Sequence, residues 1–113
     1  MNRKKVQLFN DGTLMLCKLK DSEEKLYPVF PNLRFENRTI GAERFFKARE
    51  AQHKISMLVR IPQAKGVSDE DIAVIGDMQY RILQLQTIND TCPRCWQLTL
   101  EKVKKRQVFK NGH

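Results

Sequence analysis

The sequence predicts a mainly β protein: a small antiparallel β-barrel or sandwich of about six to seven short strands, with one α-helix inserted midway. Three observations predict this fold. Apolar and polar residues alternate with period two over most of the chain, which is typical of half-buried strands. Turn-forming pairs such as Asp11-Gly12 and Gly76-Asp77 separate these stretches. The alternation is replaced once, over residues 40–52, by good helix formers.

The first half of the chain contains three strand candidates. Residues 6–8 and 13–20 flank Asp11-Gly12, and this pair predicts a hairpin because its turn needs positive φ. The stretch 13–20 is apolar on both faces near its middle, which indicates a central strand. Residues 27–36 alternate as well but include two prolines. Because proline cannot donate a ladder hydrogen bond, we expect an edge strand or one broken by a bulge.

The helix is predicted over residues 40–52, with Thr39 as a cap and Glu43 and Lys47 paired at i,i+4. Strand alternation returns over residues 54–61. The segment from Pro62 to Glu70 is expected to be a loop.

The second half predicts a hairpin of strands 72–75 and 78–88 around Gly76-Asp77. The apolar phase slips by one residue near Leu83, which indicates a bulge. A last strand is expected over residues 96–101, and the chain should fray after Val103.

Length and charge favour one soluble domain. The chain has 113 residues, enough for one core, so residues 1–113 are treated as a single domain. The net charge of +8 is concentrated at the two ends, and we expect basic, flexible termini over about residues 1–4 and 104–113. No apolar stretch suits a signal peptide or a membrane span, so we expect a cytoplasmic site of synthesis and no membrane partner.

Cys92-Pro93-Arg94-Cys95 is the pattern that most invites a chemical interpretation. Two thiolates at this spacing can hold half of a zinc site, and Cys17 and His53 could supply the other half on paper. A hairpin turn that contains two cysteines is the favoured interpretation, and disulfides are not expected in a cytoplasm.

No nucleophile–base arrangement is recognisable, so the sequence predicts neither an enzyme nor a cofactor. Residues 69–71 form an acidic cluster after Ser68. We interpret it as a helical turn begun by this serine, with the acids near its N-terminus, rather than as a cation site, because hard cations need more oxygen ligands.

The order of these elements resembles the head–tail joining (head-closure or stopper) proteins of long-tailed bacteriophages and prophages. The similarity covers roughly residues 4–104. Residues 41–48, Gly-Ala-Glu-Arg-Phe-Phe-Lys-Ala, resemble the family's Gly-x-Glu-aromatic-aromatic-x-Ala. The similarity also includes His-basic-apolar-Ser/Thr-apolar at residues 53–57 and a strand–tight turn–strand unit at residues 74–82. Leu58 stands where the family often has an arginine.

The resemblance implies a structural virion protein, assembled in the host bacterial cytoplasm, that forms a ring below the portal. The ring would close the DNA-filled head and provide the platform for the tail. Its partners would be other copies of itself, the portal or adaptor, tail proteins and, non-specifically, packaged DNA. Residues 36–52 and the loop 62–71 are the candidates for a segment that plugs the channel. Candidates for the subunit interface or the DNA channel are Arg34, Arg38, Glu43, Arg44, Phe45, Phe46 and Lys65.

Two other functions remain open from the residues alone. A small nucleic-acid-binding barrel would need basic and aromatic residues interleaved on one face, as in Arg34, Phe35 and Arg38 or in Tyr80-Arg81. A small metal or redox domain would centre on Cys92 and Cys95.

Overall fold

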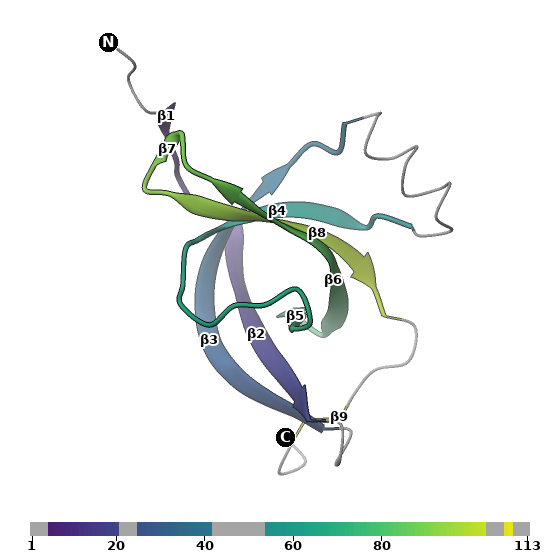
Figure 1. Ribbon diagram of the computed structural model, residues 1–113. Helices are drawn as coiled ribbons and strands as arrows, with labels where there is room; N and C mark the ends of the chain where they lie inside the picture. Colours follow the sequence, from purple (N-terminus) through teal and green to yellow (C-terminus); the bar gives the residue numbers. More distant parts are fainter. Residues whose placement is uncertain (1–4, 21–24, 42–53, 104–107, 110–113) are drawn as a thin grey trace.

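Figure 1 shows the computed structural model of the chain, which describes residues 5–20, 25–41, 54–103 and 108–109. Within these residues the strands are β1 (Lys5–Val6), β2 (Gly12–Lys20), β3 (Lys25–Arg38), β4 (Met57–Pro62), β5 (Ile72–Ile75), β6 (Met78–Ile88), β7 (Thr91–Cys92), β8 (Cys95–Lys102) and β9 (Val108–Phe109). No helix long and apolar enough to cross a membrane occurs in these parts of the chain.

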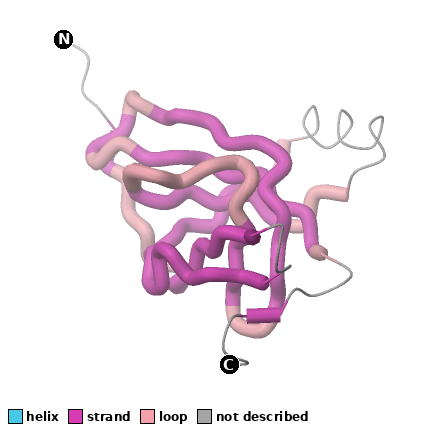
Figure 2. The backbone as a smooth tube through the Cα atoms, turned by 60° about the horizontal axis from the view of Figure 1, so that its bottom comes forward, coloured by secondary structure: helices cyan, strands magenta, loops and turns pink. Residues whose placement is uncertain are grey.

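Six of the strands form a closed antiparallel β-barrel, so the predicted barrel is confirmed. The order around the barrel is β2-β5-β6-β8-β4-β3, and pairing between β2 and β3 closes it. The closed curve of the strands is visible in Figures 1 and 2. Closure removes most of the unpaired strand edges that an open sheet of this size would expose.

The barrel interior is filled by one apolar cluster to which every barrel strand contributes. Its members are Leu14, Leu16, Phe35, Val59, Ile61, Ala73, Ile82, Leu98 and Leu100. A second cluster is formed by Cys17, Leu26, Ile72 and Val74. Because neighbouring residues of a strand point to opposite faces, Leu16 and Cys17 enter different clusters. β2 is paired on both sides, with β3 and β5, which confirms the central position predicted for it.

The hairpin of β5 and β6 forms where the sequence predicted it. Ile75 pairs with Met78 across the turn, and Gly76 has φ of 60°, a value that glycine adopts without the steric cost of a Cβ atom. In β6 the register with β8 shifts between Ile82 and Gln84. The expected bulge at Leu83 is therefore confirmed.

The prolines of β3 coincide with breaks in its pairing. The register with β2 shifts twice, so that Leu14, Leu16 and Cys17 face Leu33, Phe30 and Pro28. Extra residues therefore lie on β3 at each shift, as expected for a bulged strand. On its other side, among the described residues, β3 pairs with β9 at residues 25–26 and with β4 at residues 36–38. The prediction of a strand that is part edge and part bulged is confirmed.

The prediction for the N-terminal segment is wrong. Residues 6–8 do not form a hairpin with β2: β1 pairs parallel with β7, Val6 opposite Cys92. Gly12 instead begins β2 with φ of 142°, and a Cβ there would lie 3.1 Å from the ring of Phe35. In the expected C-terminal tail, β9 pairs with the start of β3, and the other residues after Val103 lie outside the described residues.

The predicted helix cannot be followed in the structure. Residues 42–53 lie outside the described residues, as do residues 1–4, 104–107 and 110–113 of the expected basic ends. β3 ends at Arg38 and β4 begins at Met57, and just before β4 Ser56 N already donates to Leu100 O of β8 at 2.8 Å.

Candidate functional site

A row of polar side chains crosses the outer face of the barrel. Strand register places Glu36 of β3 opposite Arg60 of β4, Arg60 opposite Gln97 of β8, and Gln97 opposite Gln86 of β6. The neighbours of these residues along each strand, such as Val59 and Leu98, fill the barrel interior. The four residues therefore point outward together. We refer to Glu36, Arg60, Gln97 and Gln86 as the polar row.

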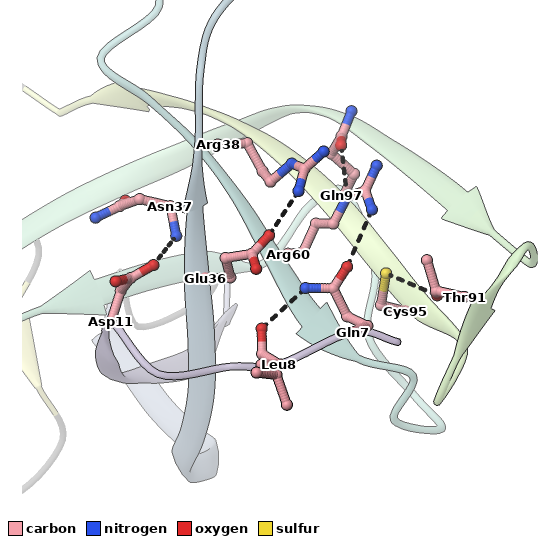
Figure 3. Close-up of polar contacts among 10 residues, drawn as sticks. All are labelled: Gln7, Leu8, Asp11, Glu36, Asn37, Arg38, Arg60, Thr91, Cys95 and Gln97. Atoms are coloured by element: carbon pink, nitrogen blue, oxygen red, sulfur yellow. Dashed lines mark hydrogen bonds and ion pairs between the residues drawn. The ribbon is translucent and has the colours of Figure 1, made fainter. Parts of the chain in front are cut away.

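The N-terminal segment, residues 5–11, lies over this row, and we call it the strap. One end is fixed to the β6–β8 side by hydrogen bonds from Lys5 N to Asp90 O and from Gln7 N to Cys92 O, both 3.0 Å. The other end is fixed to β3 by Asp11, whose N donates to Phe35 O at 2.9 Å. Figure 3 shows the strap crossing the strands that carry the row.

Gln7 connects the strap to the row. Its side chain is only 5% exposed, and its Oε1 accepts a hydrogen bond of 3.0 Å from Arg60 Nη1. Arg60 Nε donates to Gln97 Oε1 at 2.9 Å, and Gln97 Nε2 donates to Gln86 Oε1 at 3.3 Å. Arg60 thus serves two acceptors at once, for which the fixed planar fork of its guanidinium is well suited. These contacts connect Gln7, Arg60, Gln97 and Gln86 in series. Figure 3 shows the part of this network from Gln7 through Arg60 to Gln97.

Glu36 ends the row as a charged group. Arg38 Nη1 lies 2.8 Å from its Oε1. Burial alone would raise the pKa of Glu36, but hydrogen bonds from Arg38 and Gln7 and the positive charges of Arg38 and Arg60 outweigh it, and the pKa falls below 4.5. Glu36 is therefore an anion at neutral pH that stabilises the surrounding arginines.

A shallow polar pocket adjoins the row where β3 ends. It is lined by Asp11, Glu36, Asn37, Arg38 and Thr39. Asp11 Oδ2 accepts a hydrogen bond of 2.8 Å from Asn37 N, which holds the strap to β3. Two carboxylates and a guanidinium suit binding of a polar or charged group. Among these lining residues there is no nucleophile paired with a base, so the pocket offers contacts rather than covalent chemistry.

The strap exposes its apolar side chains. Val6 is 78% exposed and Leu8 is 58% exposed, whereas Gln7 between them is buried. The alternation is thus the reverse of the usual pattern, in which the apolar face of a strand is covered. Apolar side chains that stay exposed side by side often mark an interaction surface.

Three of the predicted interface residues, Arg34, Arg38 and Lys65, lie in the described part of the chain. Arg34 and Arg38 are exposed on β3, and Arg34 Nε donates to the strap at Phe9 O, 3.1 Å away. Lys65 is exposed in the β4–β5 loop. On β3, Arg34 and Arg38 lie on either side of Glu36 in the alternation, Arg34 bonded to the strap and Arg38 to Glu36. Glu43, Arg44, Phe45 and Phe46 lie outside the described residues.

The loop at residues 63–71, part of the second plug candidate, is tied to the barrel. Lys18 Nζ of β2 contacts Asp71 Oδ1 at 2.8 Å and Gly66 O at 3.0 Å. Val67 packs against the core. Because both a buried carboxylate and an apolar side chain anchor it, this loop is a poor candidate for a moving plug.

The acidic cluster in this loop forms a turn capped by Ser68, although the turn is not helical as predicted. Ser68 Oγ accepts a hydrogen bond from Glu70 N at 3.2 Å, and Asp71 Oδ2 accepts one from Ser68 N at 3.0 Å. The Asp71 carboxylate is thus occupied by protein donors.

The three cysteines are free thiols in different surroundings. Cys17 and Cys95 are buried and Cys92 is exposed. Burial, followed by the negative charge of Asp71, raises the pKa of Cys17 to about 11. Within the described residues no group of three or more metal-ligating side chains forms, so Cys17 does not complete a zinc site with Cys92 and Cys95. His53 lies outside the described residues.

The aromatic residues of the nucleic-acid interpretation are not surface platforms. Phe35 is 3% exposed and belongs to the core, and Tyr80 and Trp96 pack partly buried against it. Bases stack on exposed aromatic faces. Arg34 and Arg38 therefore lack the interleaved aromatic residue that a nucleic-acid surface on β3 would need.

Sequence reasoning missed Gln7, Arg60 and Gln97 as a unit. Arg60 and Gln97 sit at outward positions of their strands, where the alternation predicts ordinary solvated residues. The available signal was Gln7, a polar residue between two apolar ones. Only the register of β4 and β8 brings Arg60 and Gln97 together beneath it.

No known protein family, no curated protein and no solved structure matches this chain.

Proposed function

We propose that the chain is a structural protein of a tailed bacteriophage or prophage, a head-closure subunit that forms a ring below the portal. The ring retains the packaged DNA and provides the platform to which the tail attaches. The motifs at residues 41–48 and 53–57 and the small antiparallel barrel support this proposal. Its mechanism is steric closure through repeated subunit contacts.

The observation that carries the proposal is the long connection between β3 and β4, residues 39–56. Arg38 pairs with Leu58, so the connection leaves and re-enters the barrel between two adjacent antiparallel strands. Such strands need only a two- to five-residue turn. A segment inserted at this place, with both ends held by strand pairing, suits a part that reaches from the barrel into a channel.

The surroundings of this connection favour contact with DNA. Arg34 and Arg38 are exposed on β3, where the connection begins, and cations near a channel can contact phosphates without reading sequence. The competing plug candidate, the loop at residues 63–71, is anchored by Lys18 and Asp71. The β3–β4 connection is therefore the segment that we assign to the channel.

The test is removal of the gene from the genome that carries it, followed by induction and electron microscopy of the particles. We expect tailless heads that have packaged DNA but lose it, together with separate free tails. Complementation with the wild-type gene should restore complete virions. Complementation with a chain that lacks residues 42–53 should restore ring attachment but not DNA retention.

Complete, infectious virions without the gene would end the proposal. Binding of short oligonucleotides by the purified protein, with strong salt dependence, would then become the next property to measure.

A further inference from the structure

The strap has the features of an arm that can leave its own barrel. It is held by hydrogen bonds: backbone bonds from Lys5 and Gln7 to the β6–β8 side, the bonds of the Gln7 side chain with Arg60 and Glu36, and the bond from Arg34 to Phe9 O. None of its apolar residues, the exposed Val6 and Leu8 and the partly buried Phe9, belongs to either apolar cluster of the barrel. Its release therefore removes no apolar side chain from the core, and each hydrogen-bonding group can be satisfied by water.

A pivot for such movement lies at Asn10, which is exposed. On its C-terminal side, Asp11 is held to β3 through Phe35 O and Asn37 N. On its N-terminal side, residues 5–9 form the part of the strap that can move. β2 and the core need not change when it does, because Gly12 already begins the first barrel strand.

We propose that residues 5–9 exchange between copies of this chain, so that the strap of one subunit docks on the polar row of the next. The polar row identifies its own binding partner. The row binds Gln7 through Arg60, and because every copy of the chain has the same row and the same strap, the row of one copy can bind the strap of another. Exchange of an identical element is a low-cost route to assemblies, because every hydrogen bond that a strap leaves on its own barrel is formed again on the neighbouring barrel.

The exposed apolar side chains supply the driving force for exchange. Val6 and Leu8 are 78% and 58% exposed on a single subunit. A strap that reaches a neighbour runs between two barrels, where its outward side is covered. In that arrangement the polar side of the strap lies on the row and its apolar side is buried at the interface, so the apolar side chains are no longer exposed to solvent. The exchanged strap would be a subunit contact of the proposed ring, and in that respect the inference rests on the proposed function.

The test uses the native thiol of Cys92. Val6 and Cys92 are register partners in the β1–β7 pair and are both exposed, while Cys17 and Cys95 are buried and do not compete. A strap chain with Val6→Cys and Cys92→Ser has a thiol on the strap and none at its own docking site. It is mixed with the wild-type chain, which has Val6 on the strap and Cys92 at the docking site, and the mixture is oxidised with diamide. A mixed disulfide then joins residues 6 and 92 of different chains.

The matched control is a chain with Val29→Cys and Cys92→Ser, because Val29 is also an exposed apolar residue but lies outside the strap. This chain reports random collisions between exposed thiols. Docking raises the effective concentration of the two thiols, so we expect roughly tenfold more mixed disulfide from the strap chain than from the control. Non-reducing gels and mass spectrometry of the linked peptides measure the yield, and unchanged melting curves verify that both variants fold.

Equal yields from the strap chain and the control would overturn the exchange. The experiment needs only purified protein, so its outcome is separate from the fate of the proposed function. Tailless particles after gene deletion together with a background yield would leave the ring standing and place its contact elsewhere. A high yield together with normal virions would leave strap exchange standing as self-association outside a phage.

Discussion

Replacement of Arg60 by alanine tests whether the polar row stabilises the fold. Arg60 donates to Gln7 Oε1 and to Gln97 Oε1, and these two glutamines are 5% and 8% exposed. The variant leaves two buried acceptors without this donor. Each unsatisfied buried acceptor costs about 1–3 kcal/mol, and water that enters the space of the missing side chain reduces this, so we expect a total loss of about 2–4 kcal/mol.

The assay is urea denaturation at pH 7, followed by fluorescence of Trp96, the single tryptophan. A change in midpoint at constant slope gives the change in free energy of unfolding. Arg60→Lys should lose less than Arg60→Ala, since one ammonium can replace one of the two donors. Arg94→Ala, at an exposed turn position, is the control and should stay within about 0.5 kcal/mol of wild type.

A double-mutant cycle assigns the effect to the strap. Gln7→Ala alone should cost about 1 kcal/mol, because the partly exposed Arg60 can still be hydrated. In the double variant, Gln7→Ala should add little to the loss of stability that Arg60→Ala causes alone, which gives a coupling free energy of about 1 kcal/mol between the two residues. If Arg60→Ala differs from wild type no more than Arg94→Ala does, the row contributes nothing to stability and the reasoning is refuted.

Three further predictions concern other charged and thiol groups. The pKa of Glu36 is lowered below its ordinary value of 4.5 in the folded protein, so the ionised carboxylate stabilises the fold above pH 4.5, and this contribution is lost as the pH falls through the folded pKa. Glu36→Gln should therefore flatten the decline in the free energy of unfolding over this acidic range, and an unchanged pH profile would contradict the assignment. Lys18→Met leaves the buried Asp71 carboxylate without its cation, so it should destabilise by about 2 kcal/mol more than Asp71→Asn in thermal or urea unfolding, and a reversed order would exclude the ion pair as the anchor. In native protein at pH 8, a thiol reagent should modify the exposed Cys92 rapidly. It should modify Cys17 slowly, because that thiol is buried and has a pKa of about 11. Cys92→Ser should remove the fast phase of the reaction, and a fast phase that persists in this variant would refute the assignment.

Much of the barrel could be predicted from local patterns. The β5–β6 hairpin follows from Gly76-Asp77 between two alternating stretches, and the bulge at Leu83 follows from the slip in apolar phase. The bulges of β3 follow from its prolines, because a missing N–H has the same consequence wherever the strand lies. These features depend on short-range geometry, which the sequence encodes directly.

The predicted N-terminal hairpin is wrong because its partner is chosen at long range. Asp11-Gly12 is a suitable turn, but turn chemistry only permits a hairpin and does not choose the partner. Lys5 and Gln7 bond to Asp90 O and Cys92 O instead, and contacts this distant in sequence leave no local signal. Val6 and Leu8 would form a buried face in the predicted hairpin, whereas in the structure they are exposed.

By itself, the sequence determined the β class, most strand positions, the turns and the bulges, because alternation and backbone restrictions act within a few residues. The tertiary structure alone decided the closure of the barrel between β2 and β3, the strap, and the polar row beneath it. Gln97 shows why: its place in β8 predicts a solvated side chain, yet it is 8% exposed and hydrogen-bonded to Arg60 of β4. Burial on an outer face depends on which distant segment lies across it, and that is set by register and long-range pairing rather than by local pattern.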